Sequence, residues 1–170
     1  MGHAARPAAS RQLPAYADFA PTGRDPLALA VKLTAAGGPV TEPLPTASPT
    51  ATVDGYEVHL AGSVAAGDDG ELRFEVSRDG AAVTDLEPYL GAYGHLVAIR
   101  ASDHAYLHVH PTEASSPERV AFAVHVPSAG AYRLFLDFRH DGVVHTAAFT
   151  LDFAGGSSGD GHQEEAERGH

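Results

Sequence analysis

Histidines are the residues of this chain whose type and spacing suggest chemistry. Four of the eleven lie within residues 94–111, GHLVAIRASDHAYLHVHP. Imidazole nitrogens are favoured ligands of Zn(II) and Cu(II). The chain has no cysteine, and its one methionine is Met1, so a metal site in this segment would use nitrogen and oxygen ligands. The segment therefore predicts Cu(II) or Zn(II) as cofactor rather than Cu(I), which prefers sulfur.

The spacing of these histidines predicts how they are brought together. We expect a β-hairpin with a four-residue turn at residues 101–104, a register that places His95 opposite His110. Alternate side chains of a strand share a face, so His108 joins them, with facing Cβ atoms ~5 Å apart. His104, in the turn, is the fourth candidate ligand. The alternative is that these are surface histidines on an ordinary strand.

Other polar residues carry less weight in this interpretation. Asp103, Glu87 and Glu113 are the carboxylates nearest in sequence, and each is a candidate oxygen ligand. Most histidines outside the segment are expected to face solvent or to lie near the termini. His145 falls on the inward phase of its strand and is expected to be partly buried with a hydrogen-bond partner.

Alternation with a period of two dominates from residue 56 onward and predicts half-buried strands. Apolar residues occupy every second position in four rows, at 56–60, 72–76, 120–126 and 132–138. Asp141-Gly142 is a strong signal for a two-residue hairpin turn, which pairs His140 with Val143. No window has a helical repeat.

These strands predict an all-β fold, an immunoglobulin-like β-sandwich of about seven antiparallel strands, because turns recur every 8–12 residues. Tyr132, after Gly130-Ala131, is expected to form the tyrosine corner of that fold. A cupredoxin-like barrel is the alternative.

The N-terminal third contains part of a repeat. Residues 17–38 align with residues 136–156, with Asp18-Phe19 on Asp137-Phe138, and both segments run through a turn and a strand to Gly-Gly. The alternative is that any two hairpins look alike. The repeat predicts an orphan β-hairpin before the sandwich, the last two strands of an upstream module.

Composition completes the predicted domain organisation. We expect a disordered start, a two-strand remnant of the upstream repeat, a Pro/Thr-rich linker, the immunoglobulin-like sandwich and a flexible acidic tail, at residues 1–12, 13–36, 37–52, 53–153 and 154–170. The N-terminus shows no apolar core of signal-peptide length, and no stretch of about 18 consecutive apolar residues occurs.

Charge and motifs exclude several function classes. The formal net charge of −11 disfavours a nucleic-acid partner, which needs clustered Lys and Arg. There is no HExxH helix, phosphate-binding loop or dinucleotide fingerprint. Residues 155–159 match G-x-S-x-G by chance, since a nucleophile elbow needs a following helix. We therefore expect no enzyme, with a metal-dependent enzyme at the histidines as a minor alternative.

Several segments resemble a known group of proteins: VDGYEVHLAG, VSRDGAAVTDLEPYLGAYGHLVAIR, AYLHVHP and PSAGAYRLFLDF. They are similar to the C-terminal module of two-domain exported proteins of actinobacteria, loosely related to YtkA-like and FixH-like immunoglobulin-fold domains. The resemblance covers residues 53–153, and 13–36 matches the end of the first module. It implies an extracytoplasmic or secreted module linked to copper and heavy-metal handling.

The sequence thus predicts an extracytoplasmic module that sequesters or delivers a metal ion through His95, His108 and His110. The competing hypothesis is a structural or interaction module without metal, packing against a partner envelope protein. An apolar row that needs covering is formed by Leu27, Leu29, Val31 and Leu33, so the 13–36 hairpin is expected to dock on the sandwich or to form a homodimer.

Overall fold

The computed structural model describes residues 10–19, 27–38, 42–107 and 109–155. These residues form twelve strands and include no helix long and apolar enough to cross a membrane. The chain divides into two compact units, Met1–Leu44 and Pro45–His170, which we describe separately.

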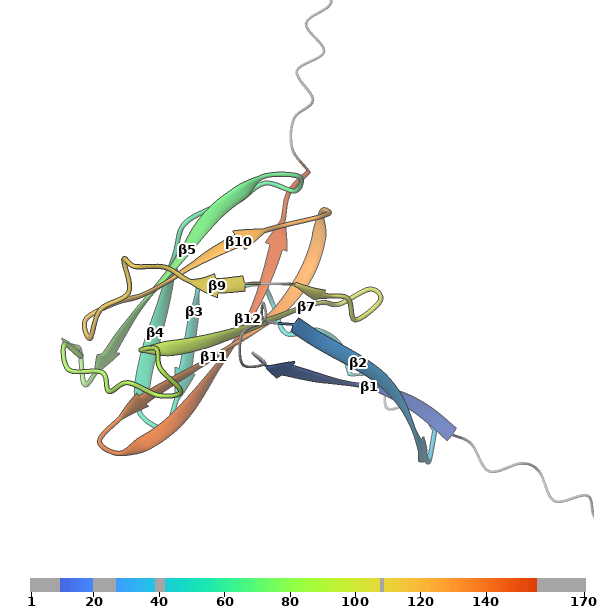
Figure 1. The fold of residues 1–170 in the computed structure, drawn as a ribbon, viewed down its shortest axis with the longest axis horizontal. Helices are drawn as coiled ribbons and strands as arrows, with labels where there is room; N and C mark the ends of the chain where they lie inside the picture. Colours follow the sequence, from blue (N-terminus) through green and yellow to red (C-terminus); the bar gives the residue numbers. More distant parts are fainter. Residues whose placement is uncertain (1–9, 20–26, 39–41, 108, 156–170) are drawn as a thin grey trace, which may run out of the picture. The chain divides into compact units, whose positions relative to one another are not determined.

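The larger unit is a two-layered antiparallel β-structure (Figure 1). Its strands are β3 (Thr50–Val53), β4 (Tyr56–Ala61), β5 (Asp69–Arg78), β6 (Ala81–Ala82), β7 (Gly94–Arg100), β8 (Tyr106–Leu107), β9 (Val109–Pro111), β10 (Val120–His125), β11 (Gly130–His140) and β12 (Val143–Phe153). One sheet has the order β3-β4-β5-β10-β9, with β6 beside β5, and the other has the order β12-β11-β7-β8. The predicted all-β sandwich is confirmed.

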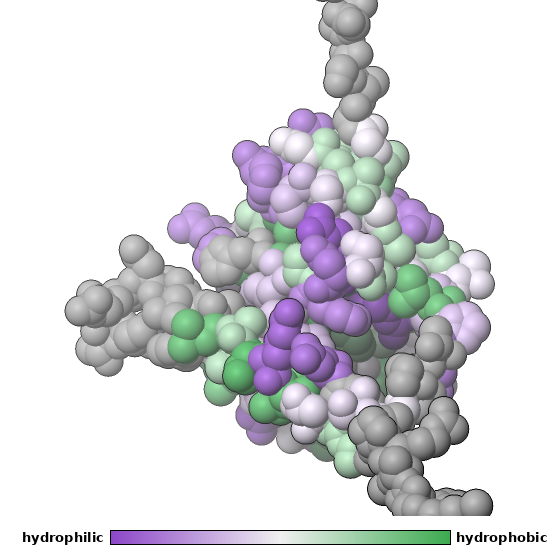
Figure 2. Space-filling view, turned by 90° about the vertical axis from the view of Figure 1, so that its right-hand side faces the viewer, coloured by the Kyte–Doolittle hydropathy of each residue, from purple (hydrophilic) through white to green (hydrophobic). Residues whose placement is uncertain are grey.

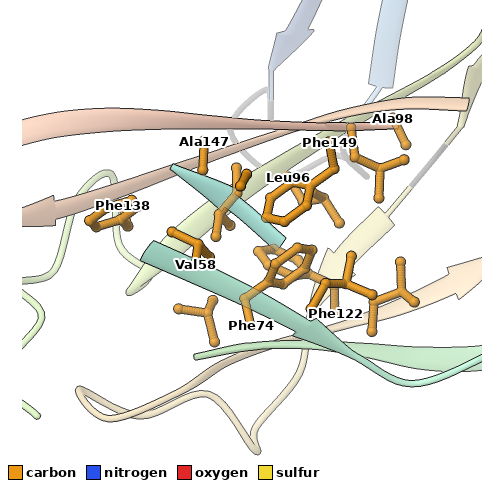
Figure 3. Close-up of a cluster of buried hydrophobic side chains, with 14 of the residues drawn as sticks. Val58, Phe74, Leu96, Ala98, Phe122, Phe138, Ala147 and Phe149 are labelled. Atoms are coloured by element: carbon orange, nitrogen blue, oxygen red, sulfur yellow. The ribbon is translucent and has the colours of Figure 1, made fainter. Parts of the chain in front are cut away.

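The core lies between the two sheets and is built from the alternating residues that the sequence marked as inward. Val58, Phe74 and Phe122 approach from one sheet, and Phe138 and Phe149 from the other (Figure 3). All five are at most 2% exposed. The Phe74 ring makes edge contacts with those of Phe122 and Phe149 at centroid distances of 5.9 and 5.5 Å. Burial of these rings, with that of the aliphatic side chains around them, stabilises the sandwich.

Strand pairing favours the immunoglobulin-like version of the sandwich. With β4 as the first strand, β4-β5-β10-β9 and β12-β11-β7 have the pairing of the ABED and GFC sheets of that fold. The exact topology stays a prediction. The tyrosine corner is confirmed, because the hydroxyl of the buried Tyr132 donates to the carbonyl oxygen of Ser128 at 3.0 Å.

The smaller unit contains an antiparallel hairpin of β1 (Ser10–Phe19) and β2 (Leu27–Ala36), paired in register from Ser10↔Ala36 to Phe19↔Leu27. Cross-strand pairs Leu13↔Leu33, Ala15↔Val31 and Ala17↔Leu29 share one face. The hairpin predicted at 13–36 is therefore present, and β1 starts three residues earlier, within the segment predicted to be disordered.

The sandwich also begins earlier than the predicted residue 53. β3 starts at Thr50, and the Ser48 amide donates to the Thr150 carbonyl at 3.0 Å, so part of the predicted linker belongs to the sandwich. Most of the predicted tail, 156–170, lies outside the described residues. On the face of the molecule in Figure 2, strongly hydrophobic side chains form separate small patches among hydrophilic ones.

Candidate functional site

The predicted histidine hairpin is correct at its turn and wrong beyond it. The Arg100 amide donates to the Ala105 carbonyl at 2.9 Å, and β7 and β8 pair through Ile99↔Tyr106 and Ala98↔Leu107. After Leu107 the chain leaves this sheet, and β9 pairs with β10 in the other sheet (Figure 1). The crossing gives β10 a hydrogen-bonding partner along an edge that would otherwise be open.

This crossing separates two of the predicted ligands. His95 lies opposite Asp137 in one sheet, whereas His110 lies opposite Ala123 in the other. The predicted His95–His110 pairing is therefore wrong. The reason is non-local: the edge of β10, not the turn, determines where residues 109–111 pair.

His95 already has a structural role. Its Nε2 lies 2.8 Å from the Tyr89 carbonyl oxygen, and the two rings meet edge-on with centroids 5.7 Å apart. A carbonyl only accepts hydrogen bonds, so Nε2 carries the proton and donates. Nδ1 is then the nitrogen of His95 that has a lone pair for a metal ion.

The other predicted ligands occupy three different settings. His104 lies in the turn with a φ of 60°, and His110 is exposed on β9. His108 lies outside the described residues. No group of three or more His, Cys, Asp or Glu residues suited to a metal ion occurs among the residues that the structure describes. Metal binding by His95, His104, His108 and His110 stays a prediction.

Two of the predicted oxygen ligands have other partners. Glu87 pairs with Arg139 at 3.0 Å and accepts a hydrogen bond from the Gly142 amide at 2.8 Å, which directs it to the β11–β12 turn. Asp103 pairs with Arg100 at 2.6 Å and accepts from the Ala105 amide. Glu113 is exposed after β9.

The Arg100–Asp103 pair is also the strongest electrostatic feature of the turn. Hydrogen bonds from the Arg100 guanidinium, and then from the Ala105 amide, lower the pKa of Asp103 to about 2. The hydrogen bond to Asp103 raises the pKa of Arg100. Arg100 also donates to the Ser128 hydroxyl, which fastens the turn to the tyrosine corner. Asp103 thus holds the turn between β7 and β8 in position.

A second group of histidines, which the sequence did not predict as a cluster, gathers at the turns of the sandwich. Three two-residue Asp-Gly turns lead from β3 to β4, from β5 to β6 and from β11 to β12. Their first residues, Asp54, Asp79 and Asp141, have φ values of 49°, 52° and 51°, as type I′ turns require. Around them lies what we call the Tyr56 cluster: Asp54, Tyr56, Arg78, Asp85, His140, Asp141 and His145.

Tyr56 is the centre of a directed hydrogen-bond chain. Arg78 donates to its hydroxyl at 3.2 Å, and the hydroxyl lies 2.8 Å from Nδ1 of His140. Nε2 of His140 lies 3.1 Å from a carboxylate oxygen of Asp85, so in the neutral ring Nε2 donates and Nδ1 accepts from Tyr56. Arg78 also pairs with Asp141 at 3.1 Å.

His145 completes the cluster from the inner face. It is 8% exposed, and its Nδ1 lies 2.8 Å from a carboxylate oxygen of Asp54. Its ring packs at a tilt against those of Tyr56 and Phe138, with centroid distances of 4.7 and 5.3 Å. The prediction of a partly buried, hydrogen-bonded His145 is confirmed. The cluster links the ends of both sheets, and its groups are partners of one another. The sequence signal for it was the three Asp-Gly turns, which the strand order brings to one end.

A family model for a domain of unknown function (DUF8832) matches residues 51–155. The match covers more than half of the chain. The chain belongs to the DUF8832 family. No curated protein and no solved structure matches it. The DUF8832 domain coincides with the sandwich from β3 to the end of β12, so it includes the Tyr56 cluster and the histidine segment.

The β1–β2 hairpin lies before the DUF8832 domain and has a distinct surface. Leu13, Leu29, Val31 and Leu33 share one face and are 41–58% exposed. The opposite face holds Gln12, Pro14, Tyr16, Ala30, Lys32 and Thr34. The first face therefore carries the largest row of exposed aliphatic side chains in the described part of the chain.

Proposed function

We propose that the chain is a non-catalytic, extracytoplasmic interaction module, in which a DUF8832 sandwich carries the β1–β2 hairpin as its contact surface for another protein. The observation that carries this proposal is the row of exposed aliphatic side chains at Leu13, Leu29, Val31 and Leu33. Contiguous apolar surface of this kind marks interaction sites in soluble proteins.

Physical chemistry supports a covered rather than a bare hairpin. Two strands without a third element to pack on are at best marginally stable in water. Each strand of this hairpin also leaves one edge open to further pairing. This hairpin nevertheless pairs at ten positions. A protein surface that packs on its apolar face would supply the stability that two strands lack by themselves.

The non-catalytic part of the proposal rests on the Tyr56 cluster. Both ring nitrogens of His140 are engaged, by Tyr56 and by Asp85, and Nδ1 of His145 is engaged by Asp54. These bonds join the cluster's own side chains to one another, and a structural role in linking the turns accounts for them. The extracytoplasmic part rests on the resemblance to exported two-domain proteins.

Site-specific photo-crosslinking tests the proposal. A photoreactive benzoylphenylalanine replaces Val31 on the apolar face or, as the matched control, Thr34 on the opposite face of the same strand, and cells producing the protein are irradiated. We expect an intermolecular adduct from position 31 and little or none from position 34. Adducts from neither position, or equally from both, would contradict the interaction function.

A further inference from the structure

We infer that the partner of the apolar face is a second copy of the same chain, with the two β1–β2 hairpins packed face to face. The inference rests on the proposed interaction function and names its partner. The shape and the charge of the apolar face favour a second copy as its partner, and its size indicates how strongly the two copies associate.

The shape of the face is complementary to itself. On β2 the face carries Leu29, Val31 and Leu33, which together form a ridge of large side chains. On β1 the neighbouring positions Ala15 and Ala17 leave a shallow groove beside Val31 and Leu29, and Leu13 closes the groove beside Leu33. Sheets pack well when large and small side chains interdigitate, so a surface with both in adjacent rows can cover an identical surface.

Symmetry specifies how the two copies meet. A two-fold axis parallel to the strands, midway between the two faces, places β2 of one copy over β1 of the other at the same level along the strands. Since Ala17 and Leu29 are cross-strand neighbours, Leu29 then sits opposite the partner's Ala17. In the same way Val31 sits opposite the partner's Ala15. A two-fold axis perpendicular to the strands would instead set ridge against ridge.

Charge favours the hairpin as the place of contact. Residues 1–44 contain four Lys or Arg and three Asp or Glu, a net charge of +1, whereas residues 45–170 contain seven and nineteen, a net charge of −12. Two sandwiches therefore repel each other strongly, whereas two hairpins repel each other only weakly. The one lysine, Lys32, projects from the opposite face of the hairpin and stays outside the contact.

The size of the face indicates how strong the dimer is. Ten residues in each of two strands give a face of roughly 34 by 10 Å, so two faces bury ~700 Å². This is below the ~1,200 Å² at which stable interfaces begin. We therefore expect a weak, reversible dimer whose population rises with protein concentration and, because salt screens the repelling sandwiches, with ionic strength.

Sedimentation velocity of the full chain over about a hundredfold range of concentration tests the inference. We expect the average mass to rise toward twice that of the chain. Leu29→Ala leaves a gap over the groove and Ala17→Leu fills the groove, so each raises the dissociation constant by about tenfold. The double variant Ala17→Leu/Leu29→Ala exchanges ridge and groove at this level, and association returns to within about threefold of the parent. Thr34→Ala changes a residue on the opposite face and leaves the dissociation constant unchanged.

The possible outcomes separate this inference from the function on which it rests. A chain that stays monomeric overturns the dimer, and an adduct from position 31 to a different protein would then leave the interaction function standing. Effects of Ala17→Leu and Leu29→Ala that simply add would overturn the packing, because a ridge that covers the groove of an identical copy predicts rescue. The double variant has the composition of the parent, so its rescue would show that Leu at position 17 and Ala at position 29 are together compatible with the hairpin, and circular dichroism of the single variants checks that each of them keeps its strands.

Discussion

The two long hairpins of this chain, β1–β2 and β11–β12, are alike in pairing and opposite in environment. The strands of each pair antiparallel, over ten positions in the first hairpin and eleven in the second. The sequence repeat places Phe19 on Phe138, and each cross-strand pair of the first hairpin then matches one of the second: Leu13↔Leu33 with Tyr132↔Leu151, Ala15↔Val31 with Leu134↔Phe149, and Ala17↔Leu29 with Leu136↔Ala147.

Their environments differ because only one of them is covered. In β11–β12 the matched side chains Tyr132, Leu134 and Phe149 are at most 2% exposed, since the other sheet packs on them. In β1–β2 the matched Leu13 and Val31 are 41% and 58% exposed. Register and alternation are thus local properties of two strands, whereas burial depends on what lies across the face.

The largest expected effect is on the covered hairpin. Phe149→Ala removes a ring that contacts Phe74, and we expect it to lower the free energy of unfolding by about 3–5 kcal/mol. Val31→Ala, at the matched position of β1–β2, should change the unfolding of the sandwich by less than about 0.5 kcal/mol. Denaturant unfolding followed by circular dichroism measures both. A comparable loss from the two substitutions would show that both faces are covered.

A smaller effect is expected from the tyrosine corner, which β1–β2 lacks because Leu13 stands at the matched position. Tyr132→Phe leaves the ring in the core and removes the bond to the Ser128 carbonyl. We expect a loss of about 1–2 kcal/mol in the same unfolding measurement. Equal stability of the two proteins would mean that the corner has no energetic role.

Removing the uncovered hairpin altogether should have little effect on the sandwich. A chain that begins at Pro45 keeps Ser48 and its bond to Thr150, and its free energy of unfolding should lie within about 0.5 kcal/mol of that of the full chain. Its association should be lost. Failure of this shorter chain to fold would show that β1–β2 is an integral part of one larger sandwich.

Acid titration tests the ion pair of Arg100 and Asp103 that holds the turn between β7 and β8. The pKa of Asp103 is about 2 in the folded chain, below its ordinary value of 3.8, so its contribution to stability is complete above about pH 4 and disappears as the pH falls to about 2. Asp103→Asn should lower the melting temperature slightly at pH 5 and not at all near pH 2. A difference that is constant across this range would exclude the ion pair as its cause.

The smallest effect is expected from the histidines. We expect Cu(II) or Zn(II) affinity in a calorimetric titration to differ by less than about tenfold between the full chain and its His108→Ala/His110→Ala variant, because His95 and His110 lie on different sheets. A larger loss that itself vanishes below about pH 6.5, where imidazole protonates, would instead establish the predicted metal site.

Local patterns predicted most of the fold. The inward rows from Tyr56 to Phe138, the Asp141-Gly142 turn and the pairing of Phe138 with His145 all follow from alternation and turn chemistry, and the structure has them. The candidate site was less predictable. The crossing after Leu107 depends on an open edge at β10, and the Tyr56 cluster depends on which turns the strand order brings to one end. Neither the crossing nor the cluster can be predicted from a short window of sequence, because both depend on strands that are distant along the chain.

The three Asp-Gly turns also have a consequence for the order in which the chain folds. Each turn joins strands that are neighbours in sequence, and hairpins of this kind form in about 1–10 μs. The pairing of β5 with β10 joins Phe74 to Val120, so the chain between them must be closed at a cost in entropy. Chains dominated by such distant pairings fold in milliseconds to seconds. We therefore expect the turn-linked strands to be native-like early, while the meeting of β5 and β10 limits the folding rate.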